Sequence, residues 1–202
     1  MFYDISQEVF GCTVFPGDPQ PERRTPMRIS NGDICNLTEF SMCAHNGTHV
    51  DAPYHFIEEG KRIDEVELEA FIGDCYVVHH EGDVTAADAE RFMESAKTAG
   101  AAERLLIGGK ATVTAEAARV FADSGLRLIG NESQTVGPED APKEVHLILL
   151  GAGTILLEGI RLKGIEEGSY YLMAQPLNLG GSDGAPCRAV LGPRRTGPRR
   201  TG

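Results

Sequence analysis

The sequence of 202 residues contains no tryptophan, and no stretch of it approaches about 18 consecutive apolar residues, the length that indicates a membrane-spanning helix. An integral membrane protein is therefore not expected, and aromatic contacts to a ligand must come from Phe, Tyr or His. The first ten residues, MFYDISQEVF, carry acidic groups where a secretory signal peptide needs positive charge. Together these absences predict a cytoplasmic protein.

Basic residues are also scarce: 19 Lys and Arg stand against 30 Asp and Glu, which gives a formal net charge of -11. A field of this sign repels nucleic acids and anionic membrane surfaces, so neither is expected as a partner. The five cysteines are widely spread and form no C-x-x-C pair. This pattern argues against a disulfide framework or a zinc ribbon and favours reduced thiols in the cytosol.

The length fits one domain with a single sizeable core, which we place at residues 1–191. Residues 192–202 read GPRRTGPRRTG, a tandem copy of one short Gly-, Pro- and Arg-rich unit that cannot bury apolar surface. We expect this segment to be a disordered tail. The 24 glycines and 11 prolines of the whole sequence favour many turns and loops rather than a helical bundle.

The hydrophobic pattern predicts a mixed α/β domain with a β-rich beginning, an α/β middle and a β-rich end. Two helices are expected in the middle, one capped by Thr85 and ending near Gly100, the other capped by Thr114 and ending at Asp123. A shorter helix is expected at Ile63–Phe71. The expected strands are Phe2–Val9, Ile34–Ala44, Cys75–His79, Leu105–Ile107, Leu126–Ile129, Tyr170–Pro176 and Cys187–Leu191.

Three of the six histidines lie within eleven residues, in the segment HNGTHVDAPYHF: His45, His49 and His55, with Asp51 among them. Gly47 and Pro53 oppose a helix here, whereas a turn at Asn46-Gly47 would bring two imidazoles together. Asp51 follows His49 by two residues, so both project to one side of an extended chain. Burying these polar groups together is costly without a shared partner, and imidazole with carboxylate is a ligand set for divalent cations. The cluster predicts a metal site.

His55 can be either a fourth ligand or an acid/base group near the metal, because an imidazole titrates near neutral pH. Two distant residues are weaker candidates. His146 begins an apolar run, and Glu158 lies inside the apolar segment TILLEGI, where a carboxylate must be paired, ligated or protonated. From spacing alone, a functional and a structural role for Glu158 are equally open.

HNGTHVDAPYHF closely resembles the H-x-G-T-H-x-D-x-P-x-H-F signature of the metal-dependent cyclase family of hydrolases, to which bacterial kynurenine formamidases and isatin hydrolases belong. FPGDP at Phe15–Pro19 is similar to the family's early loop, and His146 with LLEGI is similar to its late His and Glu. GGSDGAPCRAVL at residues 180–191 is similar to its closing strand. The resemblance therefore reaches across nearly all of residues 1–191.

The resemblance implies a swivelling β/β/α fold and a homodimer or dimer of dimers whose N-terminal segments border the neighbour's site. It implies two divalent ions, Zn or alternatively Mn. His45, His49 and Asp51 would bind one, Asp51 and Glu158 would bridge to the second, and His146 would complete it. His55 would then be the proton donor and acceptor.

Three positions depart from the pattern of aryl-formamide hydrolases, and all lie in the expected substrate region. Phe15 stands where Trp is usual, Asn131-Glu132-Ser133 replaces I-D-[ST], and His146 is a single His where a pair is common. We therefore expect hydrolysis of a C–N bond in a small amide, formamide or lactam by hydroxide formed at the metals. An isatin-type lactam, a cyclic imide or an ester is the alternative substrate, and a non-catalytic metal or small-molecule binding module is the alternative class.

Overall fold

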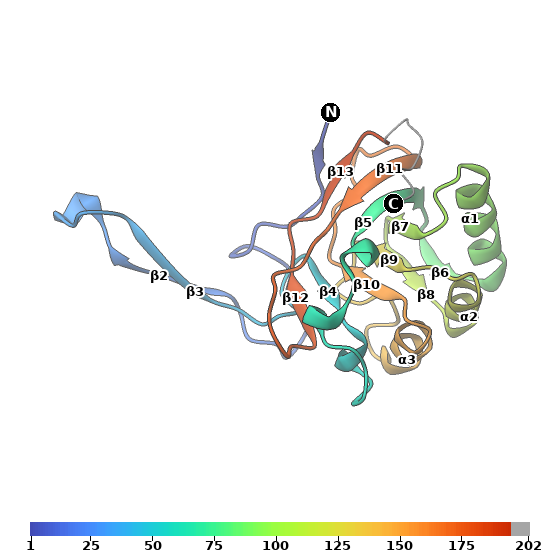
Figure 1. Cartoon of the computed structure of the whole chain (residues 1–202), viewed down its shortest axis with the longest axis horizontal. Coiled ribbons are helices and arrows are strands. Elements are labelled where there is room, and N and C mark those ends of the chain that lie inside the picture. The colour runs from blue at the N-terminus through green and yellow to red at the C-terminus, as the bar shows by residue number, and fades with distance from the viewer. Residues whose placement is uncertain (195–202) are drawn as a thin grey trace.

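The computed structural model describes residues 1–194, and a nine-stranded mixed sheet forms its centre (Figure 1). Four neighbouring strands in the middle of the sheet are parallel, and antiparallel strands extend it on both sides. In spatial order the strands are β1 (Tyr3–Asp4), β13 (Val190–Gly192), β11 (Gly168–Met173), β5 (Ile72–His79), β7 (Arg104–Gly108), β9 (Leu128–Asn131), β10 (Ile155–Glu158), β4 (His49–Asp51) and β12 (Gly184–Pro186).

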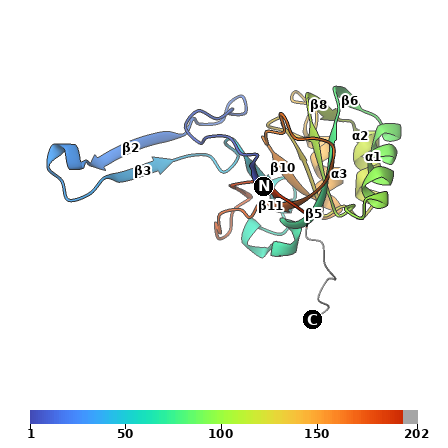
Figure 2. The same cartoon turned by 90° about the horizontal axis from the view of Figure 1, so that it is seen from above.

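Three helices cover one face of this sheet: α1 (Ala86–Thr98), α2 (Ala115–Asp123) and α3 (Lys143–Gly151) (Figures 1 and 2). The two expected caps are confirmed. The Thr85 side chain accepts a hydrogen bond from the Asp88 backbone N–H, and that of Thr114 accepts one from the Ala117 N–H. A small parallel sheet is formed by β6 (Gly82–Val84) and β8 (Ala111–Val113). Along the chain, β6 comes between β5 and α1, and β8 comes between β7 and α2.

Three of the parallel strands, β7, β9 and β10, are buried on both faces, which explains why their central residues are apolar in succession rather than alternating. In β7, Leu105 and Ile107 pack in the cluster beneath the helices, whereas Leu106 packs in a second cluster on the opposite face. That second cluster contains residues from strands near both edges, including Leu191 of β13 and Ala185 of β12. The sheet therefore curls around this core.

A long β-hairpin projects away from the body of the molecule (Figures 1 and 2). Its arms are β2 (Glu22–Met27) and β3 (Leu37–Ser41), and the short 3-10 helix η1 (Ile29–Asn31) lies at its tip. The hairpin exposes large apolar side chains: Ile34 is 92% exposed, and Ile29, Leu37 and Phe40 are about half exposed. An isolated two-stranded hairpin is marginally stable in water, so this segment lacks the packing that supports the rest of the fold.

Several sequence expectations need correction. The end of the chain is not uniformly β-rich, because the apolar run around Val145–Leu150 forms α3. Its buried residues, Val145, His146, Leu149 and Leu150, recur with a helical period against the sheet. The expected helix at 63–71 is two 3-10 turns, η3 (Ile63–Glu65) and η4 (Leu68–Ala70). β2 was not expected at all.

The fold also continues past residue 191, the end of the expected domain. β13 includes Gly192, and the Arg194 guanidinium donates hydrogen bonds to the carbonyls of Ala99 and Gly100. Residues 195–202 of the expected tail lie outside the described residues. The prediction of a mixed α/β single domain is confirmed. Within residues 1–194, every helix is too short or too polar to cross a bilayer.

Candidate metal centre

The HNGTHVDAPYHF segment forms a turn, then the short strand β4, and then the 3-10 turn η2 (Pro53–His55). The turn is held by Asn46, whose Oδ1 accepts a hydrogen bond from the Cys43 N–H at 2.9 Å. Gly47 has a φ of 65°, and a Cβ there would lie 2.8 Å from the Cβ of Cys12, so only glycine fits. The chain then becomes extended in β4, which places His49 and Asp51 on one side as expected.

Non-local pairing brings the remaining groups to this strand. β4 lies between β10 and β12, and its register places His49 opposite Glu158. His146 approaches from α3, which packs on β10. The side chains of His49, Asp51, His146 and Glu158 are all nearly fully buried. The six predicted site residues other than Phe15 therefore come together from three distant segments.

Each buried imidazole directs one nitrogen toward the carboxylates and uses the other to hold its orientation. His49 Nδ1 lies 3.0 Å from the Gly47 carbonyl, and His146 Nδ1 lies 2.8 Å from the Pro142 carbonyl. The Nε2 atoms of both rings are thereby left facing Asp51 and Glu158. Orientation of a histidine by a backbone carbonyl on its second nitrogen is typical of metal ligands.

The spacing of these atoms fits shared cations better than hydrogen bonds. His49 Nε2 lies 3.4 Å from Asp51 Oδ1 and 3.5 Å from Glu158 Oε2. His146 Nε2 lies 3.6 Å from Asp51 Oδ2 and 3.4 Å from Glu158 Oε1. Good hydrogen bonds span about 2.7–3.2 Å, whereas two ligands about 2.1 Å from one tetrahedral ion lie about 3.4 Å apart. Asp51 Oδ2 is buried without a hydrogen-bond partner, which is costly unless a cation binds it.

His45 and His55 stand at the more open side of the cluster, with their rings stacked at a centroid distance of 4.0 Å. His45 Nδ1 lies 2.9 Å from Asp51 Oδ1. Among residues 1–194, two groups of three residues each bring one possible ligand atom per residue within 4.8 Å of the others. One group is His45, Asp51 and His55. The other is His49, Asp51 and Glu158. The geometry alone therefore leaves His55 open as a ligand or as an acid/base group.

Asp183 joins the site, although the sequence analysis gave it no role. Its Oδ2 lies 2.8 Å from His45 Nε2 and 3.0 Å from His55 Nδ1. These two hydrogen bonds lower the pKa of Asp183 far below its usual value, outweighing the opposing effect of burial. The only sequence signal was its place in the GGSDGAP segment, where an aspartate among glycines is typical of a turn.

The carboxylates change the protonation of the imidazoles strongly. Burial by itself lowers the pKa of His49 and His146, but Asp51 and Glu158 raise these pKa values to about 9 and about 10. His45 responds in the same way: its carboxylate partners outweigh burial and raise its pKa to about 11. Without an ion, these raised values favour protonated imidazoles beside Asp51, whose own pKa they hold well below its usual value. Ligation requires neutral imidazole, so a cation would have to displace these protons.

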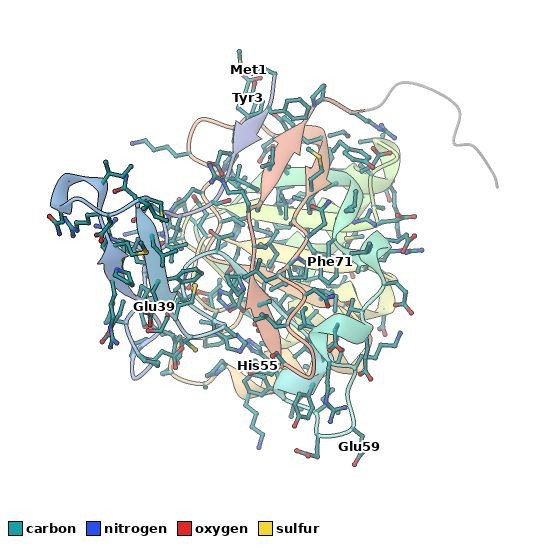
Figure 3. All side chains as sticks on the ribbon, turned by 60° about the vertical axis from the view of Figure 1, so that its left-hand side comes forward. Met1, Tyr3, Glu39, His55, Glu59 and Phe71 are labelled. Atoms are coloured by element: carbon teal, nitrogen blue, oxygen red, sulfur yellow. The ribbon has the colours of Figure 1, made fainter. Side chains whose placement is uncertain are left out.

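A cavity of about 220 Å³ opens in front of the cluster. His55, shown in Figure 3 at the opposite end of the body from Met1 and Tyr3, is one of its lining residues. Phe15 and Phe56 supply aromatic walls, and the Phe56 ring lies 4.5 Å from that of His146. The further lining residues, which the sequence analysis did not single out, are Asp18, Gln134, Thr135 and Pro142.

Comparison with known proteins identifies the family. The family model described as "Putative cyclase" matches residues 3–138. Kynurenine formamidase from Salinibacter ruber is 32% identical over 202 aligned residues, which cover 93% of this chain and 95% of that protein. The same enzyme from Bacillus mycoides is 31% identical, with 94% and 96% covered.

Solved structures agree with this result. A structure described as a potential metal-dependent hydrolase with cyclase activity superposes with a TM-score of 0.80 at 28% identity, covering 97% of this chain and 99% of the other. Isatin hydrolase A from Labrenzia aggregata has a TM-score of 0.79 at 20% identity, with 95% and 93% covered, and so shares the fold. The family model covers more than half of the sequence, and relatives more than 30% identical cover nearly all of it; this chain therefore belongs to the cyclase family.

Proposed function

We propose that this protein is a metal-dependent hydrolase that cleaves a C–N bond in a small amide, formamide or lactam, as an arylformamidase does. The observation that carries the proposal is the buried cluster itself: two carboxylates facing three imidazoles, with Asp51 Oδ2 unpaired at its centre and a cavity in front. The kinship with kynurenine formamidases over more than nine-tenths of the chain supports the same chemistry.

Two divalent cations, Zn or Mn, suit the paired arrangement of donors. His45, His49 and one oxygen of Asp51 would hold one ion. His146 would hold the second, and Glu158 would serve both together with Asp51. When bound, such ions act as Lewis acids that polarise a carbonyl and lower the pKa of a coordinated water.

His55 would carry the proton in this reaction. Its Nδ1 is engaged by Asp183, and within residues 1–194 its Nε2 makes no hydrogen bond, so a lone pair is free beside the cavity. His55 would take a proton from the attacking water and return it to the leaving nitrogen, so that an amide and water become a carboxylic acid and an amine. It would thereby act as both base and acid.

The cavity favours a small substrate with an apolar ring. Its volume of about 220 Å³ lies below the usual range for drug-sized ligands, about 300–1,000 Å³. Phe15 would pack on the substrate from one wall, and Phe56 adds a second aromatic side chain. Because Phe15 stands where aryl-formamide hydrolases usually carry Trp, a lactam, cyclic imide or ester of the isatin type remains the second candidate class.

A substrate panel with metal analysis on the same sample tests the proposal. The panel holds N-formylkynurenine, isatin, a simple cyclic imide and a simple ester. We expect about two Zn or Mn per chain and turnover of at least one of the first three. Turnover should disappear after chelation and return when Zn or Mn is added. Retained metal with no turnover of any amide, lactam or ester would identify a non-catalytic binding module instead. Turnover of esters alone would rule out the assignment to C–N bonds.

The projecting hairpin supports a homodimer, or a dimer of dimers. Its apolar side chains form an exposed surface of the kind that marks protein interfaces. A second copy of the chain would cover it. We therefore expect the purified protein to sediment as a dimer or tetramer, and the double variant Ile34→Asp, Phe40→Asp to sediment as a folded monomer. A wild-type monomer, or an unchanged mass in the variant, would contradict this assignment.

The state of the five cysteines supports a cytoplasmic location. All are free thiols in the fold, and Cys75 and Cys187 are held in surroundings where burial raises their thiol pKa to about 12. Free thiols of this kind persist in a reducing compartment. We place the protein in the cytoplasm on this ground.

A further inference from the structure

We propose that Asp183 is a positioning residue that sets, through a single oxygen, which ring nitrogen of His45 and which ring nitrogen of His55 remain free. The proposal rests on the hydrolase function above, because it assigns His45 to a cation and His55 to proton transfer. It concerns a residue outside the HNGTHVDAPYHF segment and outside the buried cluster: the Asp183 side chain is 41% exposed.

Asp183 Oδ2 is a shared acceptor for two stacked imidazoles. It lies 2.8 Å from His45 Nε2 and 3.0 Å from His55 Nδ1, both within good hydrogen-bond range. An ionised carboxylate only accepts hydrogen bonds, so each of these nitrogens must carry a proton. The shared oxygen therefore dictates the tautomer of two rings at once.

The consequences for the two rings differ. A proton on His45 Nε2 leaves Nδ1 as the nitrogen that can bind a cation, and Nδ1 is the atom that faces Asp51. A proton on His55 Nδ1 leaves the lone pair on Nε2, the nitrogen without a hydrogen-bond partner in the described chain. A carboxylate on the second nitrogen of a ligand histidine fixes its orientation and raises its basicity. The same oxygen thus serves the metal site and the acid/base group.

The backbone around Asp183 is built to hold this carboxylate in place. The Asp183 carbonyl accepts a hydrogen bond from the Ala52 N–H at 2.9 Å, which ties it to the chain just before His55. At Gly184, a Cβ would lie 2.8 Å from His45 Cε1, so glycine is needed for the imidazole to lie against this loop. Asp64 fixes the same loop from the other side by accepting the Gly181 N–H at 2.9 Å.

Substitution of Asp183 can be compared with a matched change at Asp64, which contacts the same loop from η3 (Ile63–Glu65). Asp183→Ala removes the shared acceptor, and Asp183→Asn keeps the shape and one accepting oxygen. Asp64→Asn is the control, because it makes the same chemical change at a residue that contacts no imidazole and keeps an oxygen that can accept the Gly181 N–H. Three readouts on zinc-loaded protein separate positioning from loop structure: zinc affinity by chelator competition, imidazole tautomers by ¹⁵N NMR, and kcat with KM on the substrate found in the panel.

We expect Asp183→Ala to lower zinc affinity and kcat by about 10- to 100-fold each, the usual effect of losing a group that orients a metal ligand. KM should change little, and the His55 signal should leave the Nδ1–H form. Asp183→Asn should lie between this variant and wild type, and Asp64→Asn should match wild type in all three readouts. Equal losses in Asp64→Asn and Asp183→Ala, or an unchanged His55 tautomer in Asp183→Ala, would overturn the proposal.

The outcome is separable from that of the proposed function. If the wild-type protein hydrolyses nothing in the panel, the hydrolase assignment fails, yet zinc affinity and the His55 tautomer still test Asp183. If wild type is active and Asp183→Ala retains full zinc affinity, kcat and tautomer, the role of Asp183 fails while the hydrolase assignment stands.

Discussion

Replacing Asp51 with asparagine should remove both cations and lower kcat/KM by about 10³-fold. The substitution preserves the shape of the side chain but removes the charge whose two oxygens face His49 and His146. About 4 kcal/mol of lost transition-state stabilisation corresponds to this factor, a size expected when a catalytic cation is lost. Elemental analysis and steady-state kinetics on the same preparation measure both effects.

The control for this variant is Glu59→Gln, which removes an exposed carboxylate eight residues further along the chain (Figure 3). It should retain wild-type metal content and activity. An Asp51→Asn protein that still holds two ions per chain and still turns over substrate would show that Asp51 is not the shared ligand.

Replacing His55 with glutamine should leave both ions in place and lower kcat by about 10²- to 10⁴-fold, the usual contribution of general acid–base catalysis. The expectation depends on His55 standing at the open side of the cluster, where it contacts Asp183 rather than Glu158. Metal content and kcat distinguish the two roles that the geometry leaves open. Loss of an ion in this variant would make His55 a ligand.

His80→Gln is the matched control, because His80 makes its hydrogen bond to the Asp83 carbonyl, in the connection between β5 and β6. It should keep both metal and activity. A similar fall in kcat in both variants would point to a general effect on the fold rather than to proton transfer.

The local part of the site was predictable because its geometry follows from adjacent residues. Gly47 and Pro53 exclude a helix, and the spacing of His49 and Asp51 places both side chains on one face of an extended chain, as observed. By contrast, the sequence pattern alone did not connect His146 or Glu158 to this segment, because the link is the pairing of β4 with β10. The family resemblance supplied that connection before the structure did.

Asp183 was missed for a similar reason. It lies 128 residues from His55, and an aspartate flanked by glycines is an ordinary turn residue when seen in sequence. Only the position of β12 beside β4 brings its carboxylate to the two imidazoles. The role of such a residue depends on a strand order that no local pattern specifies.

The errors in the fold prediction have equally specific causes. In α3 the apolar run at 147–150 includes the exposed Leu147, so its hydrophobic pattern does not separate a helix from a strand, although its buried residues follow a helical period. β2 contains ERRTPM, with charges on both faces and a proline, because the hairpin is exposed rather than packed on a core. In neither segment does the alternation of apolar and polar residues match the buried and exposed positions.

The insertion of β4 between two strands from the last third of the chain also determines when the site can exist. During synthesis the HNGTHVDAPYHF segment leaves the ribosome long before Glu158, Asp183 and the strands that flank it. Until those strands arrive, the early histidines lack Glu158, Asp183 and the strand pairing that hold them in place. The nascent chain can therefore complete the proposed metal site only after residues 155–186 have been synthesised, so that binding of cations and closure of the sheet would be one late event.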